Sequence, residues 1–84
     1  MMKGTAGSKE SSDCIITVTK QDHQEILIDS VVGAFFHDQI KLLIINTLKE
    51  LKVENVKVEV IDRGALDSTI KARLITAIER MNAL

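Results

Sequence analysis

The sequence predicts a small α+β domain, in which a mainly antiparallel sheet has two helices on one face. Three runs of alternating apolar and polar residues predict strands, and two longer stretches with apolar residues at helical spacing predict helices. The chain has 84 residues, which is enough for one hydrophobic core but not for a second lobe. The expected element order is therefore β-β-α-β-α, in two layers.

Residues 1–12 are small and polar, and we expect them to form a flexible N-terminal arm. Such a segment buries too little apolar surface to offset the entropy cost of ordering it. Residues 13–84 are expected to form the single domain. Apolar side chains alternate over residues 14–19 and again over residues 25–29, and a short polar connection separates the two runs. These runs are expected to pair as a hairpin.

The first helix is expected after Ser30, a residue suited to capping a helix N-terminus. Apolar positions recur at helical spacing from residue 32 to residue 51. The next run, residues 56–60, has valines on one face and charged side chains on the other. A strand of this kind belongs to a sheet that is covered on one side only.

The last helix is expected after a turn at residues 62–64, with Asp62 or a neighbour as its cap. Its apolar residues form one stripe, and its charged residues lie on the other side. The stripe consists of Leu66, Ile70, Leu74, Ala77, Ile78 and Met81.

Composition argues against several function classes. The net charge is −1 and the only aromatic residues are Phe35 and Phe36, whereas single-stranded nucleic-acid binders use basic grooves and aromatic platforms. No apolar run approaches the ~20 residues that a membrane helix needs. The single cysteine, Cys14, excludes an intrachain disulfide and fits a reducing cytoplasm. His23 and His37 stand alone, without the spacing of metal ligands.

Two short segments at opposite ends of the chain are more specific. Residues 6–13 read A-G-S-K-E-S-S-D, and residues 62–67 read D-R-G-A-L-D, with A-R following at 72–73. Together and in this order they resemble the acyl carrier (gamma) subunit of citrate lyase, over nearly the whole chain. In that family a serine of the first segment is esterified to a coenzyme-A-like group. The resemblance maps this serine onto Ser11, with Ser12 as the runner-up and Ser8 third.

The resemblance implies a non-catalytic, cytoplasmic carrier subunit of a complex that cleaves citrate to acetate and oxaloacetate. The family's prosthetic group is 2′-(5″-phosphoribosyl)-3′-dephospho-coenzyme A, joined to the serine through a phosphodiester. Its thiol carries acetyl or citryl, which the alpha subunit exchanges, and the beta subunit cleaves citryl. The implied partners are these two subunits and the transferase that attaches the group. No catalytic residue and no metal are implied.

Several alternatives remain open from the residues. A serine-rich polar segment is by itself more often a disordered tail than an attachment site. Ser68 follows an aspartate at a helix start, as the anchor does in helical acyl carriers, but the alternating strands argue against that class. Arg63, Lys71 and Arg73 could receive phosphates, although a solvated or partner-contacting face is the favoured interpretation. The rival functions are the carrier subunit of malonate decarboxylase and an unmodified α+β interaction module.

Overall fold

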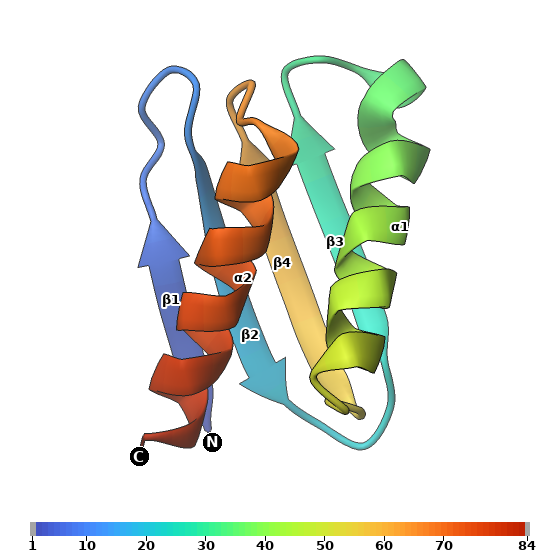
Figure 1. Cartoon of the computed structure of the whole chain (residues 1–84), viewed down its shortest axis with the longest axis vertical. Coiled ribbons are helices and arrows are strands. Elements are labelled where there is room, and N and C mark those ends of the chain that lie inside the picture. The colour runs from blue at the N-terminus through green and yellow to red at the C-terminus, as the bar shows by residue number, and fades with distance from the viewer. Residues whose placement is uncertain (1, 84) are drawn as a thin grey trace.

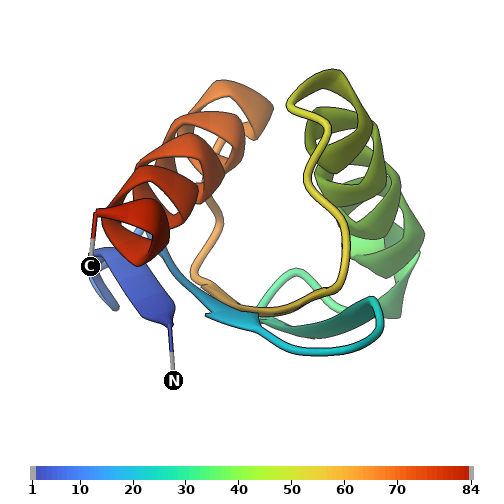
Figure 2. The ribbon, with the colours of Figure 1, turned by 90° about the horizontal axis from the view of Figure 1, so that it is seen from below.

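The computed structural model describes residues 2–83 and, for Ala34 and Phe35, the backbone only. The elements are β1 (Lys3–Gly7), β2 (Cys14–Lys20), β3 (Glu25–Ser30), α1 (Ala34–Glu50), β4 (Val56–Asp62) and α2 (Asp67–Asn82). The four strands form one sheet in the order β1-β2-β4-β3, and both helices cover the same face of it (Figures 1 and 2). The predicted two-layer α+β fold is confirmed.

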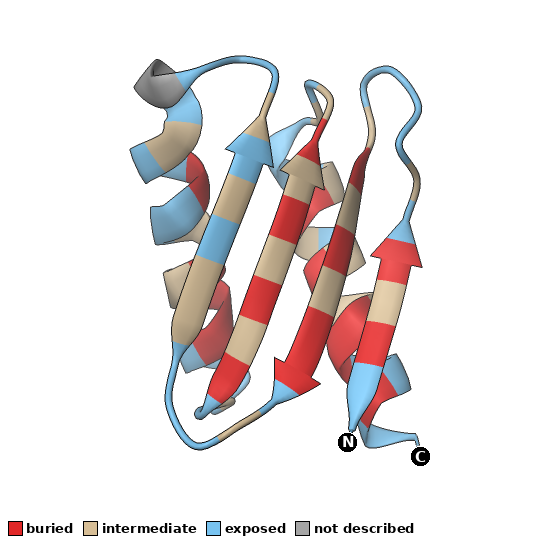
Figure 3. Cartoon of the chain, turned by 180° about the vertical axis from the view of Figure 1, so that it is seen from behind, coloured by how far each residue is buried: buried red, intermediate tan, exposed pale blue. Residues whose placement is uncertain are grey.

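The sheet is mixed. β2 pairs antiparallel with β1 and with β4, whereas β3 pairs parallel with β4. The expected hairpin between residues 14–19 and 25–29 is therefore wrong, because β4 lies between the two strands. The burial pattern gives the reason. Every second residue of β4 is buried, and strands flank it on both sides, whereas β3 has no fully buried residue and forms an edge (Figure 3).

β1 is an edge strand that the sequence did not predict. Lys3–Gly7 pairs with β2 over its full length, and Gly4 and Ala6 are buried. A Cβ atom on Gly4 would overlap the carbonyl oxygen of Ala77 and the amide nitrogen of Met81, both in the α2 backbone. The expectation of a flexible arm over residues 1–12 is therefore wrong for Lys3–Gly7. These small side chains allow α2 to lie directly on the strand.

The core lies between the sheet and the two helices. α2 contributes more to it than α1 does, and its stripe matches the predicted one except at Leu66, which is exposed. α1 buries Ile40, Ile44 and Leu48, whereas Val32 and Leu51 at the ends of its predicted stripe are 40% and 41% exposed. The sheet contributes Ala6, Cys14, Ile16, Val18, Val56, Val58 and Val60. In the described part of the chain, no helix is long and apolar enough to cross a membrane.

The two helices begin without side-chain caps. The N-cap residues are Gly33 and Leu66, so the predictions of capping by Ser30 and Asp62 are wrong. Ser30 and Asp62 instead end the neighbouring strands β3 and β4, opposite each other in the register. The Ser30 hydroxyl donates to Asp62 Oδ2 (2.7 Å), and Asp62 Oδ1 accepts the amide of Ala65 (2.9 Å). These bonds hold together the sheet end from which both helices start.

Candidate functional site

The connection between β1 and β2 contains the first of the two motifs. The amide of Asp13 donates to the carbonyl of Glu10 (3.1 Å), which closes a β-turn with Ser11 and Ser12 at its centre. Ser12 has φ 64°, the left-handed conformation that the second central residue of a type II turn requires. Ser11 therefore occupies the first central position and is exposed.

The carboxylate of Asp13 organises this loop. It accepts hydrogen bonds from the Ser8 hydroxyl (2.7 Å), the Cys14 amide (2.7 Å), and Nε and Nη2 of Arg73 (3.1 and 2.9 Å). The bonds from Arg73, then Ser8 and Cys14, lower the pKa of Asp13 to about 2. The carboxylate therefore stays charged, and the forked bond from Arg73 joins the loop to α2.

The loop is also bonded to the turn that follows β4. The amide of Arg63 donates to the carbonyl of Asp13 (2.9 Å), and the amide of Ser12 donates to the carbonyl of Arg63 (2.8 Å). Residues 6–13, 62–67 and 72–73, which the sequence presents as separate motifs, thus meet at one end of the sheet. In Figure 1 the β1–β2 and β4–α2 connections lie side by side at the top of the molecule.

The candidate serines differ in what their hydroxyl groups do. Ser8 donates to Asp13 and accepts the amide of Glu10 (3.3 Å), so its oxygen is engaged within the loop. Among residues 2–83, the hydroxyls of Ser11 and Ser12 have no hydrogen-bond partner. Ser68 is also exposed, in the first turn of α2. Within these residues no side chain bonds to the Ser11 hydroxyl, so no base is placed to activate it.

The three basic residues of the predicted cluster have separate roles. Arg73 is bonded to Asp13, and Lys71 donates to Glu50 of α1 (3.1 Å). The guanidinium of Arg63 has no hydrogen bond or ion pair to any residue in the described range. Of these three residues, Arg63 is therefore the one whose charged group remains available beside the Ser11 turn.

Cys14 lies in the core and is not placed to react. Cys14 is fully buried, and burial, with smaller effects from Asp13 and Asp62, raises the pKa of its thiol to about 11. Within residues 2–83, no group of three or more histidine, cysteine or acidic side chains is placed to hold a metal ion.

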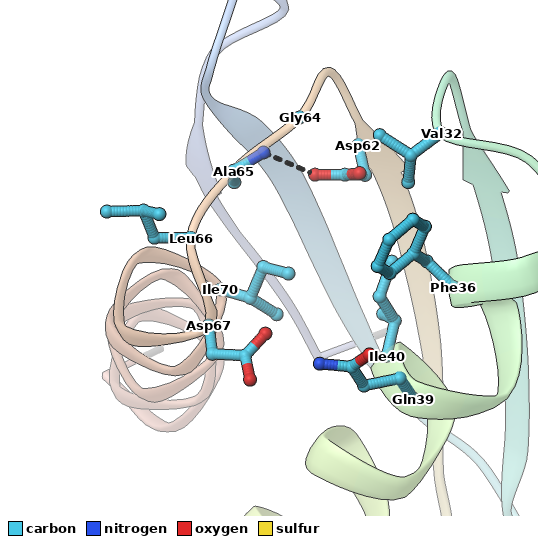
Figure 4. A pocket seen from close by; sticks show the side chains of 10 residues that line it. All are labelled: Val32, Phe36, Gln39, Ile40, Asp62, Gly64, Ala65, Leu66, Asp67 and Ile70. Carbon is cyan, nitrogen blue, oxygen red and sulfur yellow. Dashed lines mark hydrogen bonds between the residues drawn. The ribbon is translucent and has the colours of Figure 1, made fainter.

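A cavity of about 410 Å³ opens between the first turns of the two helices, beside the same end of the sheet (Figure 4). Three of its apolar side chains are unusually exposed for their type: Leu66 (72%), Val32 (40%) and Phe36 (40%). Sequence reasoning assigned all three to helix stripes and so missed the cavity. Its lining residues are Val32, Phe36, Gln39, Ile40, Asp62, Gly64, Ala65, Leu66, Asp67 and Ile70.

Comparisons with known proteins agree on the type of protein. The family model described as malonate decarboxylase delta subunit (MdcD) matches residues 2–81. The citrate lyase acyl carrier protein of Streptococcus pyogenes serotype M5 (strain Manfredo) is 53% identical over 77 residues, which cover 89% of this chain and 76% of that protein.

Two solved structures share the fold. One is from a crystal structure of a Pseudomonas malonate decarboxylase hetero-tetramer in complex with malonate, with a TM-score of 0.74 and 17% identity over 94% of this chain and 82% of that chain. The other is the Staphylococcus aureus RNase P protein, with a TM-score of 0.53 and 16% identity over 89% and 79% of the two chains. At these identities the likeness extends to the fold alone.

Proposed function

Because the chain belongs to the citrate lyase acyl carrier protein family, we propose that it is the carrier subunit of a citrate lyase, with its prosthetic group attached at Ser11. The observation on which the proposal rests is the position of Ser11. Its hydroxyl is exposed at the corner of a turn that Asp13 and Arg63 hold in place. A transferase needs an accessible hydroxyl of this kind. The fixed turn would also hold the attachment point of the tethered group in one place.

The group proposed is 2′-(5″-phosphoribosyl)-3′-dephospho-coenzyme A, joined through a phosphodiester to the Ser11 oxygen. Its terminal thiol would supply the thioester on which acyl groups are exchanged. The residues around Ser11 fit the phosphodiester, because Arg63 is bonded to the turn through its backbone and has a guanidinium with no partner in residues 2–83. Lys9, exposed in the same loop, adds a second cation.

The protein would act by bringing one thioester to two catalysts in turn. Its proposed partners are the alpha subunit, which exchanges acetyl for citryl, the beta subunit, which cleaves citryl, and the prosthetic-group transferase. A tether raises the concentration of thioester at both sites without any catalytic residue on the carrier. The cytoplasm is the compartment that this proposal implies, because thiols remain reduced there.

A carrier subunit of malonate decarboxylase is the second candidate. The family model that matches the chain is described as a malonate decarboxylase subunit, which favours this candidate. The 53% identity to a citrate lyase acyl carrier protein favours citrate lyase. Reconstitution with the alpha and beta subunits of citrate lyase, or with those of malonate decarboxylase, would separate the two by which complex becomes active.

Attachment is tested by co-expressing the chain with the matching transferase, followed by intact mass measurement and peptide mapping. We expect an adduct with the mass of the proposed group on the peptide that contains Ser11, absent from Ser11→Ala and retained in Ser12→Ala. An adduct that persists in Ser11→Ala but disappears in Ser12→Ala or Ser68→Ala would reassign the site. An unmodified mass under these conditions would reject the carrier function and leave an interaction module.

A further inference from the structure

The cavity begins where the Ser11 loop ends. The amide of Ser12 is bonded to the carbonyl of Arg63, and Gly64, the next residue, lines the cavity. In Figure 4 the backbone runs from Gly64 through Ala65 to Leu66 along one side of the cavity. The shortest route from Ser11 to the cavity would therefore follow the Arg63–Gly64 backbone.

The lining of the cavity selects the kind of ligand that it can take. Its walls are mainly aliphatic and aromatic, and its volume lies within the range of sites for small organic ligands, roughly 300–1,000 Å³. Its polar groups include the side-chain amide of Gln39 and two carboxylates. Asp62 is 1% exposed and holds the sheet end, while Asp67 lies at the start of α2. These carboxylates disfavour an anionic ligand, and the amide suits a neutral ligand with amide groups of its own.

We propose that this cavity is the resting site for the neutral thiol end of the group tethered to Ser11, with Arg63 facing the phosphates outside and Gln39 facing the pantetheine amides inside. The proposal rests on the proposed function, since it needs the tethered group. The phosphates of that group would lie near a cation at the turn, and its neutral thiol end would lie against the apolar wall between the helices.

The same lining predicts a preference between acyl groups. Acetyl adds no charge to the thiol end, so the acetylated end remains suited to the cavity. A citryl group adds carboxylates, which Asp67 at the rim would repel. The carrier would therefore shelter the acetylated end and release the citrylated one toward its partners.

The first test compares the amide NMR spectra of the apo and the loaded protein. We expect shift changes in two places: the loop at residues 8–13, from attachment itself, and the cavity, at Gln39 and at residues 64–70. Changes confined to residues 8–13 would overturn the resting site. Because this measurement uses the unaltered chain, it does not depend on any variant folding.

The second test measures how fast iodoacetamide alkylates the tethered thiol. We expect the loaded protein to react about threefold or more slowly than free dephospho-coenzyme A, the factor that applies when about two thirds of the ends are bound at any moment. Gln39→Trp places a bulky ring in the cavity and should restore the free rate. Lys41→Trp, exposed on the same helix outside the cavity, is the matched control and should leave protection intact. Peptide mapping separates any reaction at Cys14.

The outcomes separate the two proposals. An adduct on Ser11 whose thiol reacts at the free rate in the unaltered protein would overturn the resting site and leave the carrier function standing. The absence of any adduct would reject the carrier function, and the resting site with it. Equal protection in Gln39→Trp and the unaltered protein would also overturn the cavity as the place of shelter.

Discussion

Replacing Gly4 with alanine tests whether β1 is a packed strand or part of a mobile tail. The added Cβ would overlap the carbonyl oxygen of Ala77 and the amide nitrogen of Met81. Both are backbone atoms of a helix and cannot rotate away, so either β1 or α2 must shift. Overpacking of this kind typically costs ~1–3 kcal/mol.

If residue 4 belonged to a tail, Gly4→Ala should instead raise the free energy of unfolding. Alanine restricts the unfolded chain more than glycine does, and at an unstrained position this stabilises the folded state by roughly 0.4–1 kcal/mol. With Gly4 buried in a pair with Val18, the overlap outweighs this gain. We expect a net loss of about 2 kcal/mol, which for a domain of this size lowers Tm by roughly 8–16 °C.

The assay is thermal unfolding followed by circular dichroism. Lys3→Ala is the matched control, because Lys3 is exposed in the same strand, and it should change stability by no more than ~0.5 kcal/mol. A Tm for Gly4→Ala equal to or above that of the unaltered protein would refute the packing of β1 against α2.

Three further predictions concern the loop and the core. The pKa of Asp13 is lowered from 3.8 to about 2, so its stabilising contribution is complete above pH ~4 and is lost as the pH falls through about 2. The free energy of unfolding, measured in urea, should fall more across that window for the unaltered protein than for Asp13→Asn. Parallel pH profiles of the two proteins would contradict the ion pair. Leu74 is fully buried, so Leu74→Ala should cost ~2–5 kcal/mol, seen as a lower urea midpoint at unchanged slope; a loss below ~1 kcal/mol would show that the site is not close-packed. Cys14, buried and with its pKa raised to about 11, should react with a thiol reagent slowly in the native protein and rapidly in urea, and equal rates would contradict its burial.

The elements that could be predicted from the sequence are those with a strong local pattern. The valines of β4 recur at every second residue and the apolar residues of α2 recur at helical spacing, so both elements could be predicted. β1 has no such pattern: its central residues Gly4, Thr5 and Ala6 look like a polar tail, and the strand forms because their small size lets α2 approach. The order of the strands could not be predicted from the sequence either. The adjacency of β2 and β3 in sequence suggests a hairpin, whereas β4 pairs with both from far along the chain.

The candidate site shows the same limit. Its motif could be identified from residues 6–13. The fixed loop, however, depends on the ion pair between Asp13 and Arg73, and no rule of sequence spacing predicts that these two residues pair. Ser30 and Asp62 were assigned to helix caps because their residue types favour capping. In the fold the two side chains instead bond to each other across the neighbouring strands β3 and β4.

The bond between Asp13 and Arg73 has a consequence for how the protein is made. The two residues lie 60 positions apart, so Ser11 is synthesised long before the side chain that fixes its loop exists. A nascent or truncated chain that lacks Arg73 presents the same serine in a loop without its anchor. If the proposed transferase binds the folded turn, it would pass over such chains, and the ion pair would restrict the proposed attachment at Ser11 to polypeptides whose last helix has docked.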